Sequence, residues 1–256
     1  ALTFTNKAAR EMLARVRQLA GAAVREMQVS TFHSFGLRIV RENCAELGLR
    51  PHFSIYDAGD QLAIVKKAVR AISVSWKKFR PEEILFTMNS ARSPYTDELD
   101  LRRCDALDAA VMRSVWERYL PALRAANAVD FEDLLLLPLR LFKAHRAIRA
   151  RYRAQFSHIL VDEYQDTNSL QFDLLHTLAR EHRNLCVVGD DDQSIYGWRG
   201  AEVRNILDFE RHFHGATVIR LEENYRSTSV ILDAANAVIH HNTARKQKRL
   251  WTARKG

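Results

Sequence analysis

The 256-residue sequence lacks several features that define whole classes of protein. No uninterrupted apolar run reaches the roughly 18 residues that a membrane-spanning helix needs. The chain opens without the basic stretch and cleavage site of a secretory signal peptide. Nine glycines and five prolines are too few for a collagen-like or linker-dominated chain. The sequence therefore predicts a globular protein, and we expect no membrane partner.

Cysteine is also scarce. Cys44, Cys104 and Cys186 lie far apart, and no two of them form a CxxC pair. An odd number cannot complete a disulfide framework within one chain, and the ten histidines show no zinc-ligand spacing with the cysteines. These absences favour reduced thiols and a cytoplasmic location.

Charge, in contrast, is abundant and unbalanced. The 39 Lys and Arg against 31 Asp and Glu give a net charge of +8, and hydrophobic residues make up 47% of the chain. The apolar fraction excludes a disordered protein. The positive charge is compatible with a polyanionic partner but does not prove one.

Apolar periodicity divides the chain into three stretches. Short apolar runs alternate with helical patterns at both ends, and residues 51–145 form one helical pattern after another. Strands are expected at residues 1–5, 27–31, 158–162, 185–189 and 217–221. Helices are expected at residues 7–21 (with Asn6 as N-cap), 34–47, 57–72, 81–92, 97–126, 131–145, 170–180, 203–213 and 228–242. The alternation predicts an α/β fold, a parallel sheet with helices on both faces, plus an all-helical insertion. The basic tail 245–255 is expected to be mobile.

The first strand end suited to nucleotide chemistry follows residues 158–162. This apolar run ends in Asp162 and Glu163, and ligands of open parallel sheets bind at the carboxyl ends of strands. Asp162 is expected to hold Mg²⁺, which prefers a few carboxylates together with phosphate oxygens. Glu163 is expected to orient or deprotonate an attacking water. Acids at a strand end also serve simply to cap the next helix, so the pair alone leaves both interpretations open.

The second such strand, 185–189, is followed by the sequence Asp-Asp-Asp-Gln-Ser-Ile-Tyr-Gly-Trp-Arg-Gly-Ala. Gln193 offers an uncharged amide that can donate to a phosphate oxygen. Tyr196 and Trp198, beside Arg199, are the side chains that a platform for stacking single-stranded bases requires. The alternative is that the two aromatic rings belong to the core.

Five blocks of sequence resemble motifs Ia, Ib, II, III and IV of the superfamily 1 DNA helicases of the Rep/UvrD/PcrA family, most closely its Rep branch. The blocks are residues 2–12, 30–35, 162–168, 188–201 and 221–227. The resemblance implies a RecA-like motor and an ATP-dependent DNA helicase, with ATP and Mg²⁺ as cofactors, in replication or repair. It also implies 3′ to 5′ movement on single-stranded DNA and action at junctions between duplex and single strand.

The resemblance assigns roles to individual residues. Asp162 corresponds to the Mg²⁺ ligand, Glu163 to the base and Gln193 to the γ-phosphate sensor. Tyr225 resembles the tyrosine that stacks on adenine, and Arg226 the arginine that reaches the γ-phosphate. The residues that resemble DNA contacts are Phe4, Thr5, Asn6, Thr31, His33, Phe131, Tyr196, Trp198 and Arg199. A core position explains His33 equally well.

The sequence also departs from the family, because it contains no Gly-x-x-x-x-Gly-Lys-Ser/Thr P-loop and no motif V or VI. The resemblance therefore implies an internal piece of a helicase that is inactive alone. Its parts are motor domain 1A at 1–35 and 144–224, subdomain 1B at 36–143 and the start of domain 2A at 225–256. Without the P-loop strand we expect a gap or an unpaired edge in the sheet. The alternatives are the motor of a helicase–nuclease recombination subunit and, for the isolated chain, a non-enzymatic module that binds single-stranded DNA.

Overall fold

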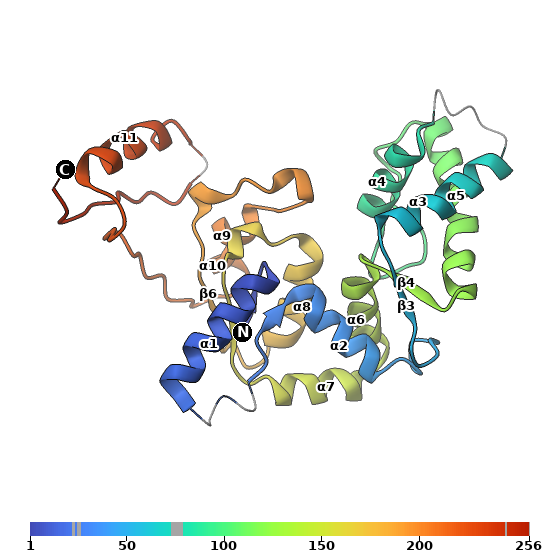
Figure 1. Ribbon diagram of the computed structural model, residues 1–256, viewed down its shortest axis with the longest axis horizontal. Helices are drawn as coiled ribbons and strands as arrows, with labels where there is room; N and C mark the ends of the chain where they lie inside the picture. Colours follow the sequence, from blue (N-terminus) through green and yellow to red (C-terminus); the bar gives the residue numbers. More distant parts are fainter. Residues whose placement is uncertain (22–23, 25–26, 73–78, 244, 256) are drawn as a thin grey trace. The chain divides into compact units, whose positions relative to one another are not determined.

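The computed structural model describes residues 1–256 except 22–23, 25–26, 73–78, 244 and 256. Its contacts divide the chain into two compact units. Unit 1 contains Ala1–Ile159 and Leu170–Asn184, and unit 2 contains Leu160–Ser169 and Leu185–Gly256. Figure 1 labels many of the helices and strands of both units.

The main sheet consists of four short strands in the order β2-β1-β5-β6. They are β1 (Leu2–Thr3), β2 (Ser30–Thr31), β5 (Ile159–Val161) and β6 (Leu185–Val187). β1 and β2 run parallel, with Leu2 opposite Ser30. The predicted α/β fold, a parallel sheet flanked by helices, is confirmed. The described strands follow one another without a gap, and β6 ends the sheet with Cys186 exposed.

Residues 217–221, expected to form a further strand, belong to no strand in the described part of the chain. Their apolar side chains lie uncovered, with Ile219 78% and Leu221 80% exposed. A branched apolar run becomes a strand where a neighbour takes up its hydrogen bonds and a helix covers its face. The strand prediction is therefore wrong for this structure. The following residues form only an isolated parallel bridge, between Glu223 and Trp251.

Two helices of unit 1 follow strands directly: α1 (Asn6–Ala20) and α2 (Phe32–Glu42). The hydroxyl of Thr5 accepts a hydrogen bond from a backbone amide in the first turn of α1, and the hydroxyl of Thr31 does the same for α2. Such a hydroxyl on an extended residue satisfies an amide that would otherwise lack a partner. The expected cap of α1, Asn6, is instead its first helical residue, and α2 is shorter than expected at its C-terminal end.

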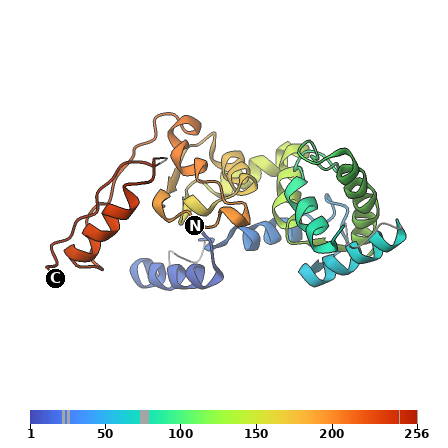
Figure 2. The ribbon, with the colours of Figure 1, turned by 90° about the horizontal axis from the view of Figure 1, so that it is seen from above.

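The middle of unit 1 is a helical subdomain with its own hydrophobic core. The core-forming helices are α3 (Ala58–Ala71), α4 (Pro81–Ala91) and α5 (Ala106–Ala125), which gather together in Figure 2. Val65, Met88 and Val115 are fully buried between them. α5 begins at Ala106 rather than at residue 97 because Asp105 caps it.

The expectation that this insertion is all-helical requires one correction. β3 (Ser54–Tyr56) and β4 (Ala128–Asp130) pair in parallel, with Tyr56 opposite Asp130. Strands of three residues are too short to display an alternating pattern, and the helices between them bring the two segments together. The insertion is therefore mainly helical with a small two-stranded sheet.

Two further helices connect this subdomain to the main sheet. They are α6 (Asp133–Ala144) and α7 (Arg146–Gln155), and α7 was not expected. α6 packs against α2 at Gly36, where an added Cβ would lie 1.8 Å from the carbonyl oxygen of Leu134. Only glycine allows the two backbones to approach so closely.

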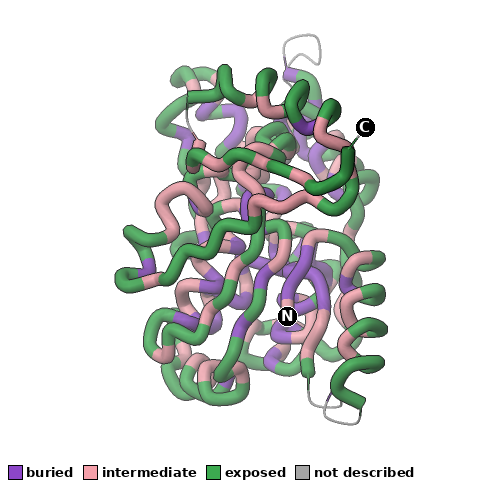
Figure 3. The backbone as a smooth tube through the Cα atoms, turned by 90° about the vertical axis from the view of Figure 1, so that its left-hand side faces the viewer, coloured by how far each residue is buried: buried purple, intermediate pink, exposed green. Residues whose placement is uncertain are grey.

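Unit 2 is built from short elements. They are η2 (Tyr164–Asp166), η3 (Asp191–Gln193), η4 (Gly197–Arg199), α9 (Arg204–Leu207), α10 (Phe209–His212) and α11 (Ser229–Ile239), while α8 (Ser169–Ala179) lies mostly in unit 1. The helix expected at 203–213 is broken into α9 and α10 at Asp208. Much of the chain after residue 217 is exposed (Figure 3). No helix among the described residues is both long and apolar enough to cross a membrane.

Candidate nucleotide and nucleic-acid sites

The predicted acid pair lies at the end of β5. Ile159 and Val161 are buried, and the chain then turns sharply at Glu163, whose φ of 54° and ψ of 42° lie in the left-handed region. This conformation costs a residue other than glycine about 1–2 kcal/mol. The turn leaves Asp162 half-buried and Glu163 exposed at the strand end. A strained residue that carries an exposed carboxylate is typical of functional sites.

A buried amide connects this strand end to the next one. The Nε2 of Gln165 donates to Oε2 of Glu163 at 2.9 Å, and its Oε1 accepts from the backbone amide of Asp190 at 3.0 Å. The approach depends on Gly189, because an added Cβ there would lie 2.5 Å from Gln165 Oε1. Gln165 was not among the site residues predicted from the sequence. Two features of the sequence could have pointed to this role. Gln165 is an amide two residues after Glu163, and Gly189 directly precedes the acidic residues 190–192.

Gln193 lies at the end of η3, after β6. Its Nε2 donates to Oδ2 of Asp190 at 2.8 Å, and its side chain is exposed. Glu163 and Gln193 are therefore connected by three hydrogen bonds, through Gln165 and Asp190. The structure thus brings the predicted base and the predicted phosphate sensor into one bonded arrangement.

Further carboxylates follow β5 and β6 in the sequence. Burial and the neighbouring charge of Glu163 raise the pKa of Asp166. Asp190, Asp191 and Asp192 place one carboxylate oxygen each within 4.8 Å of one another. The ammonium group of Lys248 already lies among these three carboxylates. Asp162 therefore remains the candidate Mg²⁺ ligand.

Tyr225 and Arg226 lie in unit 2, shortly after residues 217–221, and both are exposed. The Tyr225 hydroxyl donates to Oε2 of Glu223 at 2.6 Å, and this hydrogen bond raises the pKa of Tyr225. The backbone amide of Arg226 donates to Oδ1 of Asn224 at 2.9 Å. Within the described residues, neither side chain bonds to the acid pair, so the structure does not bring these two predicted residues to the predicted base.

The candidate DNA contacts of unit 1 form two groups. In the first, the hydroxyl of Thr31 donates to Ser34 Oγ at 2.9 Å and approaches Asn6 Oδ1 at 3.4 Å. Thr5 and Phe4 lie next to this group along the chain, with Thr5 exposed and Phe4 half-buried. The group presents hydroxyl and amide side chains at the end of β1 and β2, which suits contacts to a sugar–phosphate backbone.

The second group is a stacked pair of rings. The rings of His33 and Phe131 lie 4.2 Å apart, centroid to centroid, with 26° between their planes. Phe131 is 51% exposed. Burial lowers the pKa of His33 to about 4, so the imidazole is neutral at pH 7. His33 therefore supports the Phe131 ring and adds no positive charge for a phosphate.

The candidate DNA contacts of unit 2 are exposed aromatics. Trp198 is 68% exposed, which rules out the interpretation of this side chain as a core residue. Tyr196 is half-buried, and its ring centroid lies 6.5 Å from that of Trp198. Arg199 ends η4, and its side chain lies outside what the structure describes.

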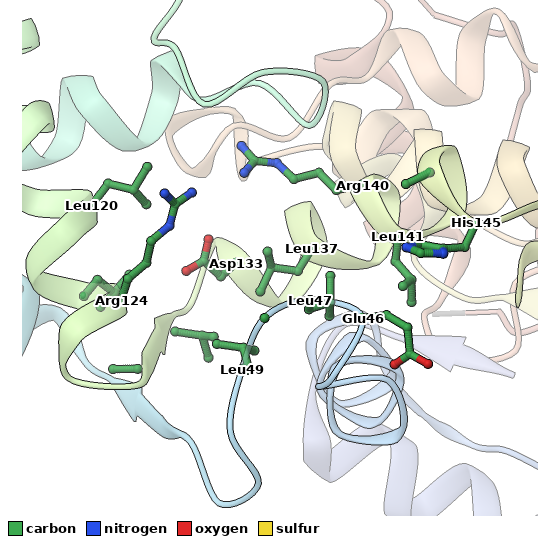
Figure 4. A pocket seen from close by; sticks show the side chains of 15 residues that line it. Glu46, Leu47, Leu49, Leu120, Arg124, Asp133, Leu137, Arg140, Leu141 and His145 are labelled. Atoms are coloured by element: carbon green, nitrogen blue, oxygen red, sulfur yellow. The ribbon is translucent and has the colours of Figure 1, made fainter.

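Unit 1 also contains a cavity of about 480 Å³ between α5, α6 and the loop after α2. Leucines such as Leu47 and Leu137 line much of it (Figure 4). Its two arginines, Arg124 and Arg140, both donate to the carboxylate of Asp97. None of the predicted site residues lines this cavity, so it is separate from both candidate sites.

An acid pair and an amide that follow neighbouring strands of a parallel sheet are typical of α/β domains that bind nucleotides. Comparison with known proteins makes the class specific. Residues 1–214 match the model of the UvrD/REP helicase N-terminal domain. The chain belongs to this family, which confirms the resemblance of its motifs to the Rep/UvrD/PcrA family.

Three relatives named ATP-dependent DNA helicase PcrA match nearly the whole chain. The chain is 44% identical over 253 residues to the ATP-dependent DNA helicase PcrA of Bacillus subtilis, covering 98% of this chain and 34% of the relative. It is 42% identical over 257 residues to PcrA of Staphylococcus epidermidis, covering 100% of this chain and 35% of the relative. It is 42% identical over 254 residues to PcrA of Leuconostoc citreum, covering 98% and 34%. The chain therefore spans about a third of the length of these relatives.

Proposed function

We propose that this chain is the central part of the motor of an ATP-dependent DNA helicase. The observation that carries the proposal is the bonded arrangement of Glu163, Gln165, Asp190 and Gln193 at two adjacent strand ends. Three hydrogen bonds hold a carboxylate and an amide in fixed relation, as hydrolysis of a phosphate chain by positioning and electrostatics requires. Membership of the UvrD/REP family supports the same function.

In this proposal each side chain has one task. Asp162 holds Mg²⁺, which when bound neutralises charge on the phosphates. Glu163 orients and deprotonates the attacking water, and Gln193 donates to the γ-phosphate. Arg226 approaches the γ-phosphate in the manner of an arginine finger, and Tyr225 stacks on the adenine. The half-buried Asp162 beside the exposed Glu163 fits a metal with few protein ligands.

The proposed DNA contacts are aromatic rings and small polar groups. Trp198 and Phe131 offer exposed π-faces on which bases of any identity can stack. Thr31 and Asn6 contact the sugar–phosphate backbone. The substrate is single-stranded DNA next to a duplex junction, with 3′ to 5′ movement, and the protein acts in the cytoplasm. The direction, the junction and the location rest on the resemblance to the family.

We propose further that the chain belongs to a longer protein, as its coverage of the PcrA relatives suggests. Residues 1–35 and 144–224 would form the first motor domain, 36–143 its insertion and 225–256 the start of the second. The chain alone is expected to bind DNA without hydrolysing ATP, since it contains no P-loop.

The first test uses the chain itself. Trp198→Ala should weaken binding of single-stranded DNA by about 1–3 kcal/mol with little dependence on base identity. Trp251→Ala is the matched control, because Trp251 is also exposed (52%) but lies outside the proposed contact. Fluorescence anisotropy of a labelled oligonucleotide gives both affinities. Equal losses in the two variants contradict the proposed DNA contact.

The second test uses the full-length helicase. Glu163→Gln should keep binding of nucleotide and DNA but reduce steady-state ATP hydrolysis by a factor of about 100 or more, as loss of a positioned base does. Phosphate release with and without single-stranded DNA measures this effect. Near-normal turnover in Glu163→Gln contradicts the role of the base.

A further inference from the structure

The segment after α11 carries basic side chains that lie on the acidic run after β6. Lys248 Nζ is 2.5 Å from Asp190 Oδ1, 3.0 Å from Asp191 Oδ1 and 3.1 Å from Asp192 Oδ2. Arg245 donates from Nε and Nη2 to the two carboxylate oxygens of Asp192, at 2.8 and 2.6 Å. The basic tail 245–255, expected to be mobile, is thus bonded within unit 2 to the acidic residues that precede Gln193.

The two carboxylate oxygens of Asp190 have different partners. Oδ1 accepts from Lys248 Nζ and from the backbone amide of Asp192, at 2.5 and 3.0 Å. Oδ2 accepts from Gln193 Nε2 at 2.8 Å. A carboxylate is rigid and planar, so the ammonium group that fixes one oxygen also fixes the direction from which the other oxygen receives the Gln193 amide.

From this geometry we propose that Lys248 is a positioning residue for Gln193, acting through the Asp190 carboxylate. The proposal rests on the proposed role of Gln193 at the γ-phosphate. Lys248 touches neither nucleotide nor water in it. Its task is to hold the exposed amide in one rotamer before the phosphate arrives, so that no free energy of reorganisation is spent during the reaction.

The electrostatics of the cluster require such a cation. Three carboxylates within 4.8 Å of one another repel strongly, and without a positive group between them they turn apart. The Lys248 side chain is only 16% exposed, so water screens its contacts less than it screens a fully exposed pair. Burial lowers the pKa of Lys248, but its hydrogen bonds to the three carboxylates outweigh this effect and raise the pKa overall.

Lys246 provides a matched control within the same segment. Its Nζ pairs with Glu210, at 2.5 Å, and makes no contact with the carboxylate of Asp190 among the described residues. Lys246→Met therefore removes the same charge, two residues from Lys248, and leaves the Asp190–Gln193 hydrogen bond in place. Lys248→Arg is the conservative variant, because a guanidinium group can still donate to Asp190.

The first experiment detects the link in the chain without nucleotide. The side-chain amide resonance of Gln193 is assigned as the one lost from the ¹⁵N spectrum of Gln193→Ala. In Lys248→Met this resonance should shift and in Lys248→Arg and Lys246→Met it should stay near its original position. An unchanged Gln193 resonance in Lys248→Met overturns the proposal, and thermal unfolding of each variant shows that the fold is intact.

The second experiment measures the consequence in the full-length helicase. Lys248→Met should lower kcat for ATP by roughly 10- to 100-fold, as a displaced catalytic group does, with a smaller change in KM. Lys248→Arg should recover most of this loss. The double variant Lys248→Met with Gln193→Ala should be no slower than Gln193→Ala alone, because both changes remove the same positioned amide.

The outcomes separate the two proposals. Full activity of Gln193→Ala contradicts the proposed role of Gln193 itself. A slow Gln193→Ala together with a fully active Lys248→Met, or with multiplicative losses in the double variant, overturns the positioning role of Lys248 and leaves the proposed function standing. A loss in Lys246→Met equal to that in Lys248→Met shows a general effect of charge and also overturns it.

Discussion

Two charge clusters of this molecule differ in how far their cation and its first partner are exposed to water. In the helical subdomain, Arg92 Nη1 donates to both carboxylate oxygens of Asp130, at 2.7 and 2.8 Å, and Nη2 donates to Asp133. The side chains of Arg92 and Asp130 are 2% and 0% exposed. In unit 2, the side chains of Lys248 and Asp190 are 16% and 28% exposed. Both clusters satisfy several acids with few cations.

The difference in exposure determines what each cluster is suited for. Around Arg92 no water can replace a lost partner, and the hydroxyl of Tyr119 and a backbone amide complete the partners of Asp130, at 2.8 and 2.9 Å. A buried, multiply bonded set of this kind restricts the geometry and fixes the junction between β4 and α6. Around Lys248, the 28% exposed carboxylate of Asp190 lets water and salt reach part of the cluster. The second cluster is therefore adjustable, as a site that responds to a ligand must be.

The largest expected effect comes from breaking the buried cluster. Arg92→Met leaves Asp130 and Asp133 without their cation and should lower the free energy of unfolding by about 3–5 kcal/mol. Urea unfolding followed by far-ultraviolet circular dichroism measures this loss.

The control for this variant is Arg80→Met. Arg80 pairs with Glu83 at 3.5 Å, and both side chains are mostly exposed, at 68% and 65%. Its loss should stay within about 0.5 kcal/mol. Equal losses in Arg92→Met and Arg80→Met contradict the view that burial makes the first cluster indispensable.

His33 extends the comparison to a half-buried titratable group, whose pKa is lowered by burial. Its folded-state pKa of about 4 lies below the ordinary value of 6.5, so the unfolded chain binds the proton more readily. Above pH 6.5 the histidine is neutral in both states, and the free energy of unfolding has its full value. As the pH falls towards 4, the unfolded chain takes up a proton first, and the free energy of unfolding drops by up to about 3 kcal/mol. Between pH 4 and 6.5 the unfolded state binds more protons than the folded state, so the free energy of unfolding decreases as the pH falls through this range.

The measurement is a series of urea unfolding curves between pH 4 and 7. In His33→Asn the free energy of unfolding should depend less on pH, by the contribution of this one histidine. The variant His182→Asn serves as the control. A wild-type slope that persists unchanged in His33→Asn contradicts the assignment of the pH dependence to His33.

The sequence predicted the parts of the fold that are encoded locally. The acids after β5, the amide after β6 and Trp198 were all predicted from short strings of residues. The structure places the acids directly after β5, Gln193 at the end of η3 and Trp198 exposed in η4. The contacts that it could not predict are long-range. The bond between Gln165 and Asp190 joins residues 25 positions apart, and that between Lys248 and Asp190 joins residues 58 apart. The strand expected at 217–221 failed for the same reason, because a strand depends on a distant partner.

The smallest expected effect on stability comes from the partly exposed Lys248 cluster, and salt is the variable that separates it from the buried one. Lys248→Met should lower the free energy of unfolding by less than about 1 kcal/mol at low ionic strength, because water replaces part of what is lost. Near 1 M salt the screening length falls to about 3 Å, so the difference from the wild type should shrink, because ions reach this partly exposed cluster. The loss in Arg92→Met should persist at the same salt concentration, since ions do not reach a side chain that is 2% exposed. Urea unfolding of both variants at 0.05 and about 1 M NaCl makes the comparison directly. If salt removes both differences equally, or neither, then the two clusters do not differ in their access to solvent, and the distinction between a fixed and an adjustable set of charges is lost.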